Sequence, residues 1–205
     1  MLQISHKATI HILEALLHKL TVPNPEFNLD DGRLTELCQQ EDASGQEVLY
    51  NRYANAMYRI CLRYMKEENE AEDMMITGFV KAFSKIHTFE YRGPGSLEGW
   101  IKRIMVNECL MVLRKKKFEK VGLDTVSNFL DNGVHVDSQL HAEEIFKVVQ
   151  NLPNGYRTVF NMYAIEGYSH KEIGKQLGIN ENTSKSQLSK ARSSLKKTLV
   201  KLGLL

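Results

Sequence analysis

Apolar residues recur at helical spacing along most of this chain. The recurrence is clear in residues 33–117 and again in residues 142–205, where hydrophobic side chains return every three or four positions. One face of a long helix is predicted by Leu49, Tyr53, Met57, Ile60 and Tyr64. No stretch alternates apolar and polar residues as a half-buried strand would. The pattern therefore predicts an all-α fold made of two small helical domains.

Two stretches interrupt the helical pattern. Residues 1–32 hold a short helical segment and a loop with two prolines, and we assign this N-terminal extension no function. Residues 118–141 have no long period, and the stretch from Val121 to Phe146 contains five acidic residues and no lysine or arginine. An acidic, poorly periodic segment between two basic helical ones is typical of a flexible linker. The predicted domains are therefore residues 33–117 and 142–205.

The C-terminal domain has the pattern of a helix-turn-helix. Ser169 and Glu172 match a capping box at the start of a short helix. Gly178 is expected to end that helix, and Asn180 is suited to cap the next one. A narrow apolar stripe then recurs at i, i+3, i+7 and i+11, at Leu188, Ala191, Leu195 and Leu199. We expect this stripe to be buried and every other side chain of the last helix to face outward.

Such a helix suits the major groove of duplex DNA. Short polar side chains near its N-terminus would reach base edges, and its cations would neutralise phosphates, which supplies most of the affinity. The predicted contact residues are Thr183, Lys185, Ser186, Ser189, Lys190 and Arg192. Thr183 is expected to touch a phosphate near the positive end of the helix dipole. The alternative is a solvated helix whose charges serve solubility, but the capped helix and the narrow stripe favour DNA binding.

A second basic surface is predicted in the N-terminal domain. From Lys102 to Lys120 there are seven basic and two acidic residues, and aromatic residues lie just before, around a Gly-Pro-Gly loop. Aromatic rings beside a basic helix face suit single-stranded DNA, because unpaired bases stack on rings while cations hold the backbone. The predicted contacts are Tyr91, Trp100, Arg103, Asn107, Arg114 and Lys115. The alternative for Trp100 is a core position, where we also expect Phe79, Phe83 and Phe89.

Composition changes this picture little. With 27 Lys and Arg against 25 Asp and Glu, the formal net charge is only +2, so the distribution of charge is more informative than its total. Cys38, Cys61 and Cys109 form neither a CxxC pair nor a Cys/His zinc cluster, which favours buried thiols in a reducing compartment. No apolar run approaches the ~20 residues of a membrane span, and no unbroken secretory signal is present. We expect a cytoplasmic protein without membrane insertion.

Enzymatic chemistry has no support in the sequence. There is no phosphate-cradling Gly-rich loop, nucleophile motif or paired-carboxylate pattern. The N-terminal His6, His11 and His18 do not share a metal-binding spacing such as i, i+4, and His135 and His141 fall in the predicted linker. We therefore expect no catalytic residue, no metal site and no cofactor.

The motifs of both domains together resemble a known family. The first domain contains "AEDMMITGFVKAF" and "WIKRIMVNECLMVLRKKK", and the second contains "LPNGYRTVFNMYAIEGYSHKEIGKQLGINENTSKSQLSKARSSL". In these motifs the chain resembles the extracytoplasmic-function (ECF) group of the sigma-70 family, the initiation subunits of bacterial RNA polymerase. The likeness covers roughly residues 34–200 and is densest in the second domain.

The resemblance implies a role for each part. The first domain would be like sigma region 2, with Asp73, Ile76 and Thr77 on the helix that binds the clamp helices of the largest polymerase subunit. Its loop from Phe89 to Ser96 and the helix through Arg114 would melt and read the −10 element. The last domain would be like region 4, reading the −35 element and holding the flap of the second large subunit. The resemblance also implies an anti-sigma partner and a monomer when free.

Four positions depart from the family pattern. Ile76 and Thr77 stand where the family usually has a glutamine and an acidic residue. Met111 replaces an aspartate near the end of the −10 helix. Ser184 replaces an apolar residue, and we expect this change to weaken packing under the recognition helix.

The sequence therefore predicts a sigma factor that binds core RNA polymerase, directs it to promoters and assists DNA melting. The first alternative is a stand-alone helix-turn-helix regulator that binds duplex DNA as a dimer. The aromatic loop and basic helix of residues 89–117 argue against it, since a duplex binder does not need them. A second alternative, a sigma mimic that sequesters an anti-sigma factor, would not need a basic recognition helix.

Overall fold

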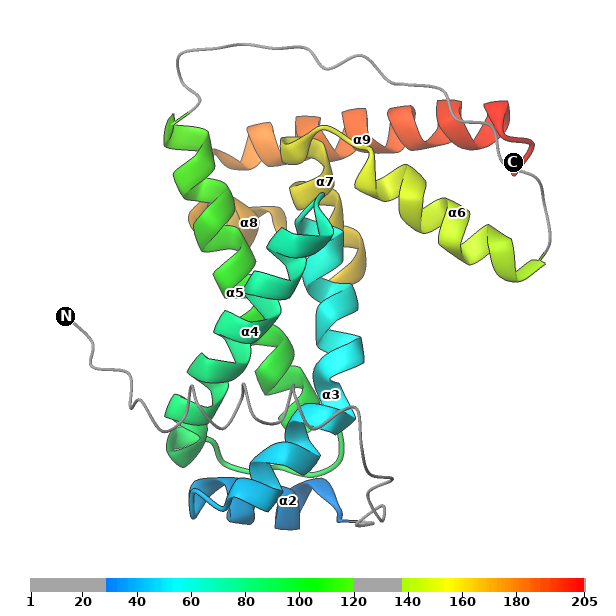
Figure 1. Cartoon of the computed structure of the whole chain (residues 1–205). Coiled ribbons are helices and arrows are strands. Elements are labelled where there is room, and N and C mark those ends of the chain that lie inside the picture. Colours follow the sequence, from blue (N-terminus) through cyan, green and yellow to red (C-terminus); the bar gives the residue numbers. More distant parts are fainter. Residues whose placement is uncertain (1–28, 120–137, 205) are drawn as a thin grey trace. The chain divides into compact units, whose positions relative to one another are not determined.

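The computed structural model describes residues 29–119 and 138–204, with side chains for residues 29–115 and 144–204. Within these residues the structure is helical and contains no strand, so the predicted all-α class is confirmed (Figure 1). The N-terminal helices are α2 (Asp31–Gln39), α3 (Ala43–Tyr64), α4 (Glu68–Lys85), the 3-10 turn η1 (Ile86–Thr88) and α5 (Ser96–Glu119). The C-terminal helices are α6 (Ser138–Gln150), α7 (Asn154–Phe160), the π-helical turn η2 (Asn161–Ile165), α8 (His170–Leu177) and α9 (Glu181–Lys201).

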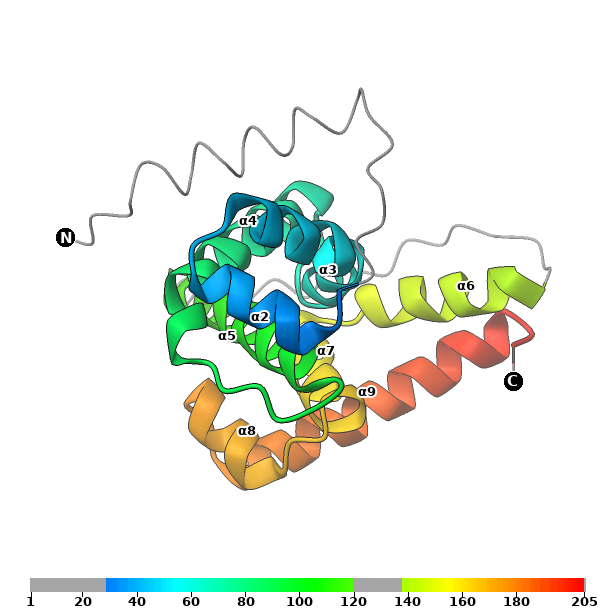
Figure 2. The ribbon, with the colours of Figure 1, turned by 90° about the horizontal axis from the view of Figure 1, so that it is seen from below.

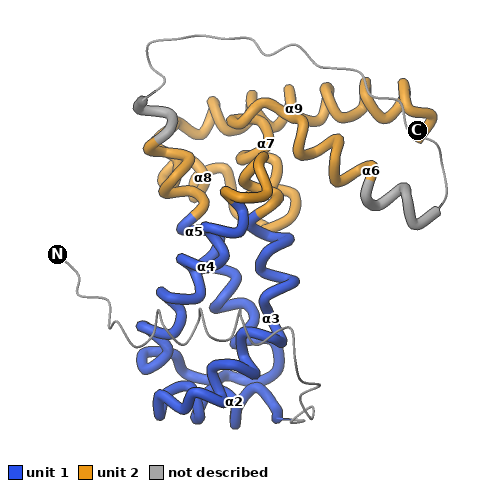
Figure 3. Tube along the Cα trace, in the orientation of Figure 1, with its two compact units in different colours: residues 1–61, 71–108 blue, residues 62–70, 109–205 orange. Residues whose placement is uncertain are grey.

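Contacts divide the chain into two compact units (Figure 3). The first runs to Cys61 and continues through Ala71–Glu108, and the second combines Leu62–Glu70 with the chain from Cys109 onward. The turn between α3 and α4 and the last part of α5 thus group with the C-terminal helices, which the predicted boundaries at 117 and 142 do not anticipate. Most of the predicted extension and linker lies outside the described residues.

The first unit is built on helices that approach closely. Seen from below in Figure 2, α2 crosses the end of the bundle formed by α3, α4 and α5. Gly78 permits close packing of α4 on α5, because a Cβ at this position would lie 2.1 Å from the Met105 sulfur. Residues predicted to share the buried face of α3, including Leu49 and Met57, are fully buried. Phe79 and Phe89 are buried as expected.

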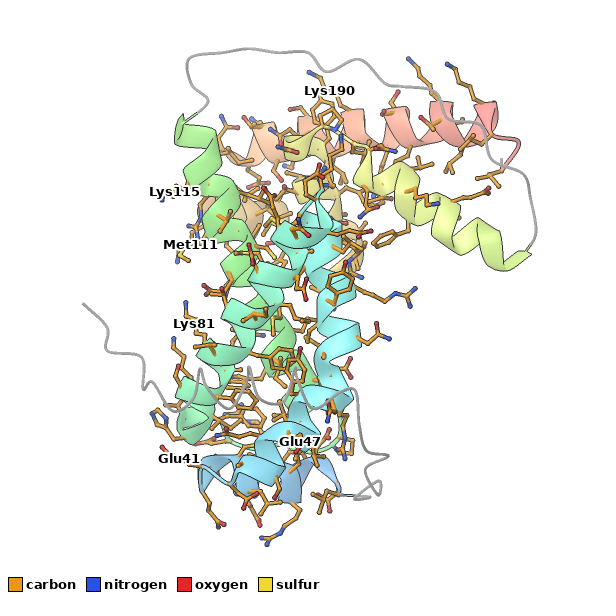
Figure 4. All side chains as sticks on the ribbon, in the orientation of Figure 1. Glu41, Glu47, Lys81, Met111, Lys115 and Lys190 are labelled. Atoms are coloured by element: carbon orange, nitrogen blue, oxygen red, sulfur yellow. The ribbon has the colours of Figure 1, made fainter. Side chains whose placement is uncertain are left out.

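One buried charge in this core has a partner. The Glu108 carboxylate on α5 is 3% exposed and accepts a hydrogen bond from the Lys81 ammonium on α4, which is labelled in Figure 4. A buried carboxylate without a counter-charge would be costly, so this ion pair explains how an acidic residue is accommodated among apolar side chains.

In the second unit, α6 and α9 lie side by side and share an apolar core with α7. The core consists of Val148, Val149, Leu152, Ala191 and Leu195. Ile145 has the helical spacing of an apolar stripe with Val148, Val149 and Leu152, but its side chain is 45% exposed. Helical spacing assigns a residue to a face, but it does not say how far the partner helix covers that face.

A buried arginine ties α7 to neighbouring backbone in the second unit. Arg157 is 2% exposed, and its guanidinium donates to the carbonyls of Gln150 at 2.8 Å, Leu152 at 3.2 Å and Tyr64 at 3.1 Å. Burial lowers the pKa of Arg157 from its ordinary value. These carbonyls lie at or just beyond helix C-termini, where backbone oxygens lack intrahelical donors, so the guanidinium satisfies groups that would otherwise be unpaired.

Candidate nucleic-acid interface

Three local caps define the ends of α8 and the start of α9, and all of them were predicted. The Ser169 N–H donates to the Glu172 carboxylate at 2.8 Å, and the Glu172 N–H donates back to the Ser169 hydroxyl, which completes the capping box. The bond from the Ser169 backbone lowers the pKa of Glu172. Gly178 ends α8 at φ +62°, and Asn180 caps α9 by accepting from the Thr183 N–H at 2.6 Å.

The exposed side of α9 carries the predicted duplex-binding residues. Leu188, Ala191 and Leu195 are buried as expected, whereas Leu199 is only half-buried. On the other side five candidates are exposed and Thr183 is half-buried; the exposed ones are Lys185, Ser186, Ser189, Lys190 and Arg192. Figure 4 shows Lys190 projecting outward from α9. The helix therefore presents polar and cationic side chains along its solvent side, an arrangement that can place them in a groove.

Several of these side chains already have intramolecular partners. Lys185 pairs with Glu181 at 2.7 Å, and this hydrogen bond lowers the pKa of Glu181. The Ser186 hydroxyl donates to the Thr183 carbonyl at 3.0 Å. The Arg192 guanidinium lies 5.7 Å from the centroid of the Tyr163 ring, within cation–π range. A phosphate would therefore compete with Glu181 for Lys185, whereas Arg192 is oriented by the neighbouring ring.

Ser184 contradicts the expectation that every polar residue of α9 faces outward. Its side chain is completely buried, and its hydroxyl lies 2.9 Å from Nδ1 of His170 on α8. The His170 ring stacks on Tyr163 at 4.5 Å between centroids. The serine is therefore hydrogen-bonded across the α8–α9 interface and leaves no unsatisfied hydroxyl there. The spacing Ser184, Leu188, Ala191 was a usable signal, since it extends the apolar stripe by one turn.

The candidate single-strand surface follows α5. Arg103, Asn107, Arg114 and Lys115 are all exposed. Met111 is 50% exposed, and Figure 4 shows it on the same side of α5 as Lys115. Met111 is therefore an uncharged, polarisable side chain among polar and basic ones. A phosphate near this position would not be repelled by a carboxylate.

The aromatic segment before α5 combines a buried ring, Phe89, with an exposed one, Tyr91. Phe89 is 8% exposed and its ring lies 5.0 Å from that of half-buried Trp100, whereas Tyr91 is 39% exposed. Two glycines with positive φ follow, Gly93 at +109° and Gly95 at +79°. At the start of α5 the Ser96 hydroxyl donates to the Gly93 carbonyl at 2.6 Å, which closes the loop.

The remaining candidates lie on α4. Asp73 and Thr77 are exposed and Ile76 is half-buried, so the three offer a mixed polar and apolar surface one helical turn long. Sequence reasoning missed two other groups of residues at the sites just described. These are His170 with Tyr163, and Gln39, whose amide reaches the aromatic segment. No local motif marks either group, because their partners are distant in sequence.

Other kinds of site find no counterpart in the described part of the chain. No group of three or more His, Cys, Asp or Glu residues there could hold a metal ion. None of the described helices is long and apolar enough to cross a membrane. The three cysteines are buried thiols, and burial raises the pKa of Cys38 to about 12.

Two family models match the chain in succession. Sigma-70 region 2 matches residues 49–119, and sigma-70 region 4 matches residues 142–195. The chain belongs to the sigma-70 family. The matched residues contain the whole of α5 and α8 and residues 181–195 of α9, whereas α2 precedes the first match.

Curated relatives specify the group within this family. An ECF RNA polymerase sigma factor SigM of Bacillus subtilis is 29% identical over 155 residues, covering 73% of this chain and 92% of the relative. An ECF RNA polymerase sigma-E factor of Haemophilus influenzae is 27% identical, covering 80% and 92%. An ECF SigE of Mycolicibacterium smegmatis is 26% identical, covering 78% of this chain and 66% of the relative. The chain is thus an ECF-type sigma factor, and a stand-alone regulator is not favoured.

Proposed function

We propose that this sigma factor binds core RNA polymerase, directs it to promoters with −35 and −10 elements, and assists strand separation without covalent chemistry of its own. One observation carries the proposal. The chain exposes a polar, basic recognition helix and, separately, a basic face on α5 that follows an aromatic segment. A regulator that binds only duplex DNA has no use for the second surface.

The −35 element is the proposed ligand of α9. Lys185, Ser186, Ser189 and Lys190 are exposed on consecutive turns and would enter the major groove. Thr183 lies at the capped N-terminus, where a phosphate is favoured by unpaired N–H groups and the helix dipole. Arg192, held beside Tyr163, would contact the backbone.

The −10 element is the proposed ligand of the aromatic segment and α5. Tyr91 and Trp100 would receive unstacked bases, while Arg103, Asn107, Arg114 and Lys115 hold the strand. Met111 lies on this face as an exposed uncharged residue. We expect it to favour an apolar contact with a base over the hydrogen bond that a carboxylate would accept.

Core polymerase is proposed to bind α4 through Asp73, Ile76 and Thr77. The exposure of Asp73 and Thr77 supports this role. Asp73→Ala should weaken co-elution with core polymerase, and an unchanged affinity would remove the residue from the contact. The family resemblance further predicts a contact between the region 4-like domain and the flap, an anti-sigma partner, a monomeric free state and a cytoplasmic location.

The test of the proposed function is transcription in vitro. Purified core polymerase, the full-length chain and the DNA upstream of its own gene should yield transcripts with a discrete start site. Transcripts that do not depend on this chain, or the absence of both transcripts and co-elution with core, would contradict the proposal. Co-elution without transcripts would keep the polymerase assignment and reject the chosen promoter.

A further inference from the structure

Helix α2 lies before the first family match, yet it contacts the aromatic segment directly. The Gln39 amide nitrogen donates to two backbone carbonyls, those of Ile86 at 3.1 Å and Phe89 at 2.8 Å. These residues stand at the start of η1 and just after its end. Figures 1 and 2 show α2 next to the segment that joins α4 to α5. The Gln39 side chain is therefore hydrogen-bonded to both ends of η1.

The turn has few hydrogen bonds of its own, although the Ile86 and Phe89 side chains are buried. η1 has three residues, and its closing bond runs from the Phe89 N–H to the Ile86 carbonyl at 3.0 Å. Short 3-10 turns have weak hydrogen-bond geometry, and the positive-φ glycines at 93 and 95 leave the following backbone free to adopt other conformations. As an exposed residue, Gln39 fills no space in the core, so its contribution comes through its amide.

A second contact lies near the other end of α2. A Cβ at Gly32 would lie 3.1 Å from Cε1 of Tyr91, which means that the tyrosine ring rests against this glycine. The start of α2 therefore adjoins Tyr91, and its end holds the Phe89 carbonyl. Phe89 in turn packs on Trp100. Both aromatic candidates for base contact are thus linked to α2.

α2 is itself anchored firmly enough to act as a support. Leu34 and Cys38 are completely buried. At the start of the helix, the Asp31 carboxylate accepts hydrogen bonds from Arg52 at 2.9 Å and from the Tyr53 hydroxyl at 2.7 Å, both on α3. The helix is therefore fixed to the core at one side while its terminal glutamine reaches the aromatic segment.

We infer that Gln39 is a positioning residue for promoter opening: it holds the Phe89–Ser96 segment in the conformation that captures bases of the separated −10 strand. The inference rests on the proposed function. A segment that is already ordered captures the unpaired bases more readily, because the entropic cost of ordering it does not have to be met when DNA binds. Gln39 itself need not touch DNA.

The experiment measures permanganate reactivity of −10 thymines in the full holoenzyme, on the promoter found by the transcription test. Gln39→Met keeps the length of the side chain and removes its donor, and Gln39→Glu places a carboxylate against two carbonyl oxygens. Both should reduce open promoter about tenfold, the factor expected from the net loss of one or two hydrogen bonds. Gln40→Ala, at the exposed neighbouring glutamine, is the matched control and should open the promoter normally.

Three further readouts separate positioning from other causes. On a template premelted at −10, Gln39→Met should recover most of its activity, because strand capture no longer competes with reannealing. Its affinity for core polymerase should stay at the native value, and its thermal midpoint should fall by only a few degrees, as expected for the loss of one or two hydrogen bonds. Unchanged opening on duplex DNA, an equal loss on both templates, or a matching fall in core affinity would each overturn the inference. Failure of the native chain to support specific transcription would instead reject the proposed function.

Discussion

The two regions of this sigma factor that are proposed to face DNA are held in place in different ways. Helices α8 and α9 begin at caps whose partners lie three residues apart, Ser169 with Glu172 for α8 and Asn180 with Thr183 for α9. The aromatic segment before α5 is held by Gln39, at sequence separations of 47 and 50 residues. A duplex-reading helix can be built from a local motif, whereas the proposed single-strand surface depends on a distant helix. Substitutions in the local caps should therefore affect duplex binding, and substitutions at Gln39 should affect strand capture.

The largest effect is expected from reversing charge on α9. Lys185→Glu combined with Lys190→Glu places two anions where phosphates approach, and promoter use should fall by more than about a hundredfold. Affinity for core polymerase should not change. Lys196→Glu with Lys201→Glu, farther along the same exposed side, is the charge-matched control. Retained transcription in the first variant would refute the −35 assignment, as run-off assays would show.

Removing the cap of α9 should have a smaller effect. Asn180→Ala leaves the Thr183 N–H without its side-chain acceptor and should cost about 1 kcal/mol of stability in the second unit. Denaturant unfolding and footprinting of the −35 duplex should both report the loss. Asn182→Ala, at an exposed asparagine of the same helix, should change neither. If Asn180→Ala also impaired transcription from a premelted template lacking a −35 element, the cap of α9 and the support of the aromatic segment would not act independently.

Ser184 tests whether the buried polar pair stabilises the recognition helix. Ser184→Ala leaves Nδ1 of His170 without its partner and should cost about 1 kcal/mol. Ser193→Ala, at an exposed serine of α9, is the control. The sequence-based view that a serine weakens packing predicts the opposite sign. A gain in the free energy of unfolding for Ser184→Ala would therefore favour that view over the hydrogen bond.

The smallest effect concerns pH. The folded-state pKa of Glu172 lies below its ordinary value because of the hydrogen bond from Ser169, so its capping contribution is present at neutral pH. The contribution should be lost as pH falls from the ordinary carboxyl range through the lower folded-state pKa. Glu172→Gln should flatten this part of the stability profile, measured by unfolding at stepwise acid pH. Because the Gln39 amide does not titrate, its hydrogen bonds to the aromatic segment should not depend on pH in this range.

The sequence predicted those features that depend on neighbours along the chain. Helical spacing located the buried stripe at Leu188, Ala191 and Leu195, and side-chain chemistry located the caps at Ser169 and Asn180. It also selected surface residues that are exposed, although exposure alone does not test their contacts with DNA. These successes share a cause, since each signal lies within one helical turn or one cap.

The misses share a different cause. Helical spacing could have placed Ser184 on the buried stripe, but its hydrogen-bond partner His170 lies 14 residues away. Ile145 is exposed and lies outside the core cluster, although it has the helical spacing of Val148 and Val149. Gln39 and Arg157 act on carbonyls that only the folded chain brings within reach. A pattern of residue types does not encode such pairings without the tertiary structure.

The most direct test of the two-surface account compares charge reversal on each surface with a premelted template that lacks the −35 element. Lys185→Glu with Lys190→Glu should transcribe this template as the native chain does, because α9 has no ligand there. Arg103→Glu with Arg114→Glu on α5 should fail on it, because the single strand loses its cationic contacts. Equal losses in both variants, or a loss confined to the α9 variant, would contradict the account.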